Sequence, residues 1–94
     1  MPAVDDNFYA RADEHIKLSN DQLGYASAGK VSASMMFSTA RFNAWVSAQG
    51  FSDAEAMKLS KEATVTYFME QYEAMLRENL DDYIHNFTTY VTVK

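Results

Sequence analysis

Only one proline and three glycines interrupt this chain of 94 residues, and that scarcity constrains its fold more than any other feature. Strands and tight turns use both residues as punctuation, so a chain that has few of them favours a small number of long helices. Hydrophobic residues make up 48% of the chain and aromatic residues 14%, which argues against disorder and for one modest core. The sequence therefore predicts a single all-α domain over residues 1–94, since its length is that of one domain.

The hydrophobic periodicity predicts a three-helix domain with a long C-terminal helix and an extended or disordered C-terminal tail. The helices and the tail are expected at roughly residues 6–28, 32–49, 53–86 and 88–94. Asp5 or Asp6 would cap the first helix, and Gly24 or Gly29 would close it in the left-handed conformation. The second helix is apolar on more than one side, which is typical of a central helix. The residues expected in the core are Ile16, Phe42, Trp45, Phe68, Tyr72 and Leu76.

The third helix has the clearest predicted start. Ser52-Asp53-Ala54-Glu55 matches a capping box, in which the serine accepts a hydrogen bond from the backbone three residues on and Glu55 bonds back. Asn79 stands where the periodicity calls for an apolar residue, so it is either a polar register device or the cap of a restarted helix. We expect one helix with a possible kink at that point.

The net charge of −5 limits the classes of partner. Nucleic-acid binding normally needs a concentrated basic face, and the eight Lys and Arg residues form no such cluster. Anionic membrane surfaces are disfavoured for the same reason, and residues 31–49, the longest weakly charged stretch, are too polar to span a bilayer. The N-terminal residues lack the features of a signal peptide, and the chain has no cysteine. We therefore expect a cytoplasmic protein without nucleic-acid or membrane partners.

Residues that could carry chemistry are few. His15 and His85 are the only histidines, and Asp82 precedes His85 by one helical turn. Helical di-metal sites instead use two Glu-x-x-His motifs, so we interpret His85 as a solvated residue at a helix end. No nucleophile elbow or phosphate-binding loop is present. The sequence predicts no catalytic, cofactor-binding or metal-binding residue and a protein that is not an enzyme.

Arg41 is the one charged residue between Lys30 and Asp53. On a buried helix its guanidinium needs a partner, because a buried unpaired charge is costly. We expect it to pair with an acid of the first or third helix. The alternative is a small-molecule binder or weak enzyme in which Arg41 anchors an anion beneath Trp45 and Tyr72, and a pocket that reaches Arg41 would favour it.

The predicted helix lengths suggest an interaction surface. At about 1.5 Å per residue, the third helix outruns the second by roughly 20 Å. The apolar residues of that overhang are Leu76, Leu80, Tyr83, Ile84 and Phe87. Because exposed apolar patches usually mark interaction sites, we predict a non-enzymatic interaction module that forms a homodimer through the C-terminal half of the third helix. Acids beside the stripe would repel in parallel register, which favours an antiparallel crossing.

Three blocks of sequence also resemble a known family. They are Arg11-Ala12-Asp13 with Ile16-Lys17-Leu18-Ser19-Asn20, Val31-Ser32-Ala33-Ser34 with Ala40-Arg41-Phe42-Asn43-Ala44, and Tyr67-Phe68 and Met75-Leu76 with Asn79-Leu80-Asp81-Asp82-Tyr83. Over about residues 5–87 the chain resembles a family of short proteobacterial proteins described as a domain of unknown function. The resemblance implies a bacterial cytoplasmic protein of helical fold, and it brings no functional residues.

Overall fold

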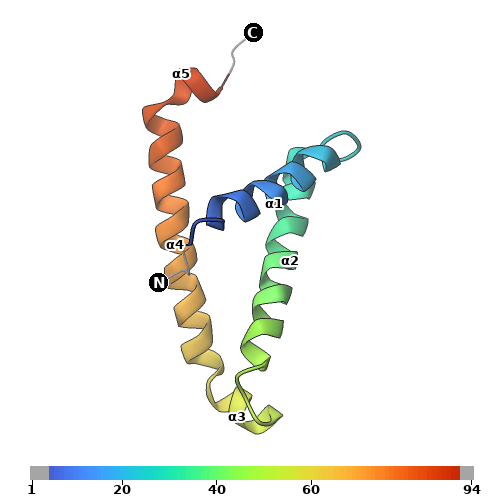
Figure 1. Ribbon diagram of the computed structural model, residues 1–94, viewed down its shortest axis with the longest axis vertical. Helices are drawn as coiled ribbons and strands as arrows, with labels where there is room; N and C mark the ends of the chain where they lie inside the picture. The colour runs from blue at the N-terminus through green and yellow to red at the C-terminus, as the bar shows by residue number, and fades with distance from the viewer. Residues whose placement is uncertain (1–4, 92–94) are drawn as a thin grey trace. The chain divides into compact units, whose positions relative to one another are not determined.

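The computed structural model describes residues 5–91, which form five α-helices and no strand (Figure 1). The helices are α1 Phe8–Gln22, α2 Ala28–Ala48, α3 Ala54–Leu59, α4 Lys61–His85 and α5 Phe87–Tyr90. The predicted all-α class is confirmed, but the three expected helices are five. The chain divides into two units at Met57 and Lys58, one with α1 and α2 and the other with α4 and α5. Each unit is described by itself, and the single domain expected from the chain length stays a prediction.

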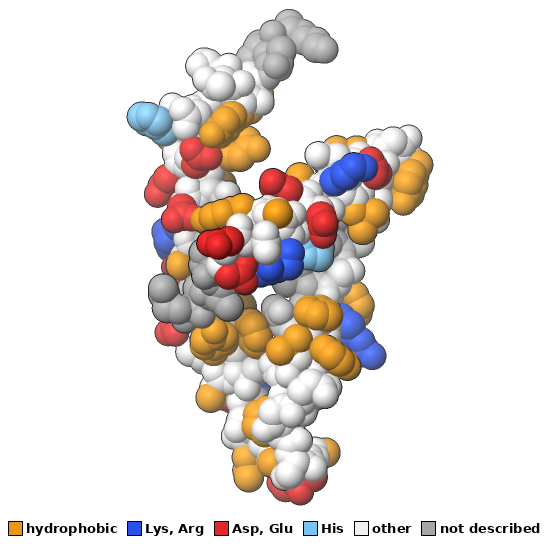
Figure 2. Space-filling view, viewed as in Figure 1, with side chains coloured by type: hydrophobic (Ala, Val, Ile, Leu, Met, Phe, Trp, Pro, Cys, Tyr) orange, Lys and Arg blue, Asp and Glu red, His pale blue; other side chains and the backbone are white. Residues whose placement is uncertain are grey.

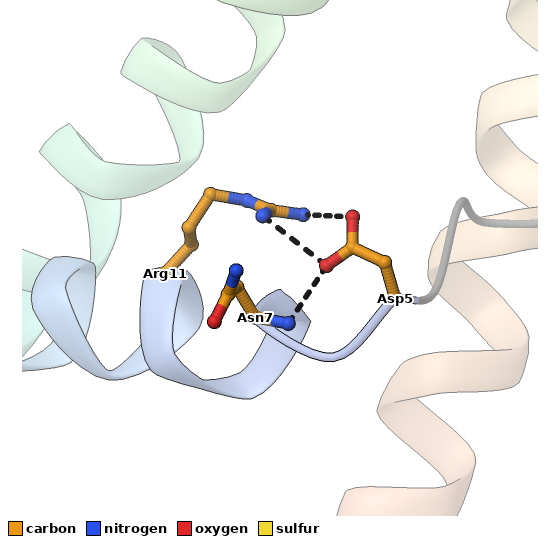
Figure 3. A network of polar contacts seen from close by, with 3 residues as sticks. All are labelled: Asp5, Asn7 and Arg11. Carbon is orange, nitrogen blue, oxygen red and sulfur yellow. Dashed lines mark hydrogen bonds and ion pairs between the residues drawn. The ribbon is translucent and has the colours of Figure 1, made fainter.

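The start of α1 is organised by Asp5 (Figure 3). Its carboxylate accepts a hydrogen bond of 2.8 Å from the backbone N–H of Asn7. The Arg11 guanidinium, one turn into the helix, donates to both carboxylate oxygens at 3.3 and 3.1 Å. The bond from Arg11, helped by the one from Asn7, lowers the pKa of Asp5 below its ordinary value of 3.8. Asp5 therefore stabilises the first turn from outside the helix, and the N-cap position belongs to Asn7.

The predicted glycine closures are wrong. α1 ends at Gln22, and its C-cap residue Leu23 keeps right-handed backbone angles. The backbone N–H of Gly24 donates to Asp21 at 3.2 Å, a bond over three residues that tightens the last turn. Gly29 lies inside α2, and no glycine of residues 5–91 has a positive φ. Short-range backbone bonds thus satisfy the helix end without a left-handed residue.

The second helix starts earlier than the predicted Ser32 because Ser27 caps it. The Ser27 hydroxyl accepts a hydrogen bond of 3.4 Å from the backbone N–H of Lys30. Within this unit α1 packs on the N-terminal part of α2, where Ser19 Oγ donates to Met35 Sδ at 3.5 Å. Val31, one turn before Met35 on the same side of α2, is 6% exposed. The one buried hydrophobic residue of residues 5–91 therefore lies close to where α1 meets α2.

The predicted core is wrong as a description of these units. Val31 is the one buried hydrophobic residue among residues 5–91. Of the six residues expected in the core, Phe68 is half-buried and the others are exposed. The physical reason is that, apart from α3 at the boundary between the units, each unit holds two helices, and two helices cannot enclose a core between them. Apolar faces of α2 and α4 therefore remain uncovered within their own units.

The region predicted as a single third helix contains two helices, α3 and α4. Asp53, not Ser52, is the residue whose carboxylate accepts a hydrogen bond of 2.8 Å from Ala56 N–H and so caps α3. Ser60 separates α3 from α4. The 21 residues of α2 and 25 of α4 give lengths of roughly 31 and 37 Å, so the predicted excess of 20 Å shrinks to about 6 Å.

α4 continues through Asn79 without a break. The Asn79 side-chain amide donates to the carbonyl of Met75 at 2.8 Å, one turn earlier in the same helix. The amide is therefore satisfied locally and does not cap a second helix. The expected tail starts as the short helix α5, and its residues 92–94 lie outside the described residues.

Candidate interaction surface

The C-terminal part of α4 carries an apolar stripe at the solvent-facing surface of its unit. Its members are the predicted interface residues Leu76, Leu80, Tyr83, Ile84 and Phe87, which are 42–73% exposed. Steps of four, three and four residues keep Leu76, Leu80, Tyr83 and Phe87 in line. Figure 2 shows hydrophobic side chains at the surface over this part of α4. The structure thus places the predicted residues together, with Phe87 as the first residue of α5.

The end of this stripe is shaped by contacts that the sequence did not predict. Asp82 accepts hydrogen bonds from the Asn86 side-chain amide at 2.9 Å and from the Tyr90 hydroxyl at 3.1 Å. The Tyr90 ring lies 4.7 Å from the Tyr83 ring. The bond to Asp82 raises the pKa of Tyr90 above its ordinary value. α5 is therefore folded back on α4, and the β-branched sequence of residues 88–94 gave no periodic signal of this turn.

The charges beside the stripe are mostly negative. α4 carries six acidic and two basic side chains. Arg77 is engaged with Glu73, four residues earlier, through a bond of 2.8 Å. Both side chains of that pair are mainly exposed, so the pair itself contributes little to stability. The surface around the stripe remains acidic.

A shallow hollow of about 450 Å³ lies on the N-terminal half of α4. It is lined by Val65, Thr66, Met69, Glu70, Tyr72, Glu73 and Leu76. Leu76 belongs to the stripe as well, so the two surfaces are continuous. The hollow is open to solvent and mostly apolar, with carboxylates on one flank. Such a surface suits an apolar group that carries a positive charge beside it.

α2 exposes an aromatic pair at its C-terminal half. The rings of Phe42 and Trp45 stack at 5.7 Å with an interplanar angle of 27°, and the two side chains are 62% and 59% exposed. Arg41 next to them is also exposed. It has no ion pair within residues 5–57, so the expected bond to an acid of the first helix is missing.

Neither histidine belongs to a constellation of functional groups. His15 lies on α1 and His85 ends α4, and both are exposed. Among the described residues no group of three His, Asp or Glu side chains could hold a metal ion. None of the described helices is long and apolar enough to cross a membrane. The uncovered apolar surfaces are therefore the features on which a functional argument can be built.

Comparison with known proteins agrees with the fold. A family model described as protein of unknown function (DUF3144) matches residues 8–84. The NMR structure of the protein NB7890A from Shewanella sp. is similar to this chain, with 43% sequence identity, a TM-score of 0.77 and 93% of each chain covered. No curated protein matches the sequence.

Proposed function

This chain belongs to the DUF3144 family of proteins of unknown function, and we propose that it is a non-enzymatic interaction module that forms a homodimer through the C-terminal half of α4. The observation that carries the proposal is the exposed apolar stripe from Leu76 to Phe87. The similarity to a Shewanella protein supports a bacterial origin, and we propose a cytoplasmic location for this chain.

The free energy gained by burying the stripe supports the proposal that another surface binds there. Neither α4 nor α5 has a buried residue in the described structure. Complete burial of one large apolar side chain stabilises by about 1.5–3 kcal/mol, so covering five side chains that are about half exposed would contribute roughly 4–7 kcal/mol per copy. That gain is comparable to the whole stability of a small domain, which makes an uncovered stripe a costly arrangement.

A second copy is a suitable cover because a two-fold axis buries the same stripe on both chains. The acids restrict the geometry of this contact. In a parallel pair Glu73, one turn before Leu76 on the same side of α4, would come closest to its own counterpart, which is unfavourable for like charges. An antiparallel crossing centred near Leu80 moves the two Glu73 side chains, each seven residues from the centre, toward opposite ends of the contact and still lets the apolar residues meet. We therefore propose an antiparallel contact.

The test is the molar mass in solution of the parent protein and of a variant with Leu80→Lys and Ile84→Lys. We expect the parent to be a dimer by light scattering at tens of micromolar and the variant to be a monomer with unchanged circular dichroism. The matched control, Glu78→Lys, makes the same change of two units in net charge at an exposed position on the opposite face of α4 and should stay dimeric. A monomeric parent would overturn the proposal, as would equal dissociation of the control.

A further inference from the structure

The hollow on α4 has an apolar floor and an unpaired carboxylate at its edge. Val65, Met69, Tyr72 and Leu76 recur at steps of four, three and four residues and form the floor. Glu70 and Glu73 stand on one flank. Glu73 is occupied by Arg77 at 2.8 Å, whereas Glu70 has no ion pair within residues 58–91. A partner surface that suits the hollow would therefore carry an apolar group with a positively charged side chain next to it.

α2 presents that combination. Phe42 and Trp45 stack against each other and are more than half exposed. Arg41 precedes Trp45 by four residues, which places the two side chains next to each other on the helix surface. α2 contains Lys30 and Arg41 and no acidic residue. The exposed aromatic pair therefore carries a positive charge beside it, the opposite of the hollow on α4.

We propose that a second copy of the chain seats its Phe42–Trp45 pair in the hollow of α4, with its Arg41 paired to Glu70. This inference rests on the proposed homodimer and names a second contact within it. Two features support the second copy as the occupant. The charges of the two surfaces are complementary, and the hollow shares Leu76 with the proposed dimer stripe. A two-fold axis then makes the contact twice, because each chain supplies one aromatic pair and one hollow.

The reciprocal geometry allows a charge-swap experiment. Arg41→Glu places two carboxylates together in both contacts of a homodimer, and Glu70→Arg places two guanidinium groups together. Each variant alone should dimerise about tenfold or more weakly than the parent, because like charges across an interface are costly. In an equimolar mixture, a dimer of one Arg41→Glu chain and one Glu70→Arg chain restores an opposite-charge pair in both contacts. Native mass spectrometry should therefore show mainly the mixed dimer, with an affinity close to that of the parent.

Matched controls keep the charge change and move it away from the contact. Lys30→Glu makes the same change at the start of α2, and Glu78→Arg makes it on the far side of α4. Both should dimerise like the parent, and circular dichroism should show all variants folded. If the single swaps leave the affinity unchanged, or if the mixture forms no preferred mixed dimer, the inference is overturned.

The outcomes also separate this inference from the proposed function. If Arg41 pairs with Glu70 of its own chain, the double variant Arg41→Glu/Glu70→Arg restores the pair, whereas a mixture of the two single variants does not. Recovery in the double variant without recovery in the mixture would therefore reject the second copy as the occupant. If Leu80→Lys with Ile84→Lys gives a monomer while the swaps have no effect, the stripe forms the dimer and the second contact does not exist. A monomeric parent refutes both.

Discussion

Val31 gives the sharpest test of how the helices pack, because it is the one buried hydrophobic residue among residues 5–91. Val31→Ala removes two methyl-sized groups at the contact between α1 and α2. Transfer of those groups costs about 1.6 kcal/mol at about 0.8 kcal/mol for each, and the cavity left behind adds to it. We expect the free energy of unfolding to fall by about 1.5–3 kcal/mol.

Val46→Ala is the matched control for this substitution. It makes the same chemical change on the same helix, at a side chain that is 47% exposed. About half of the transfer cost applies there and no cavity forms, so we expect a loss of roughly 0.5–1 kcal/mol. The difference between the two variants isolates the contribution of the α1–α2 contact.

The assay is urea unfolding followed by far-ultraviolet circular dichroism, because the signal reports loss of helix in the whole chain. The measurement is made at a concentration where dilution leaves the midpoint unchanged, so that dimer formation does not contribute. If Val31→Ala costs no more than Val46→Ala, α1 does not pack on α2 through Val31, and the arrangement of that unit described above is wrong.

Three further results are expected. Asp53→Ala should destabilise by about 0.5–2 kcal/mol in urea unfolding, while Ser52→Ala should have little effect, because Asp53 makes the capping bond of α3. In a titration followed by NMR, Arg11→Ala should raise the pKa of Asp5 toward 3.8, since Arg11 is the main cause of its lowering. The stabilisation from the charged Asp5 is present above the unfolded pKa and is lost as the pH falls through the lower folded pKa, so the variant should lose less stability than the parent in acid. Added salt should weaken a contact that depends on Arg41, and light scattering of the parent and of Arg41→Glu at two salt concentrations would detect this. A parent with the same salt response as Arg41→Glu would argue against the ion pair.

The helical class could be predicted from the sequence, but several helix ends could not. Scarce glycine and proline led correctly to helices, since little else can be built without those residues. The capping motif offered two adjacent candidates, Ser52 and Asp53, and both have a side-chain oxygen able to accept the capping bond. The break at Ser60 has no glycine or proline to mark it. Local sequence patterns therefore located the start of α3 to within one residue, but they did not predict the break at Ser60 between α3 and α4.

The apolar faces of the helices could be predicted from the sequence, but which of them a neighbouring helix buries could not. Helical spacing assigns Phe42 and Trp45 to a face whether that face is buried by a neighbour or left exposed. Val31 lies near the N-terminal end of the same helix, where α1 packs, whereas the C-terminal half of α2, which carries the aromatic pair, is left uncovered within its unit (Figure 1). The interface residues around Leu80 were identified for a reason that needs correction. The expected excess length of the helix is small, yet the side chains are exposed.

We propose binding rather than catalysis as the role of this chain, and the same surfaces support that proposal. Catalysis depends on polar groups held in fixed positions and shielded from water. The hollow on α4 is open and mainly apolar, and of the two carboxylates on its flank Glu73 is already engaged by Arg77. An apolar surface with a charge at its edge gains free energy when another apolar surface of opposite charge covers it, and the charge then selects which surface is accepted. Arg41 beside Trp45 on α2 and Glu70 on the flank of the hollow on α4 meet that requirement, which is why we attribute selection of the partner to these charges and affinity to the apolar stripe.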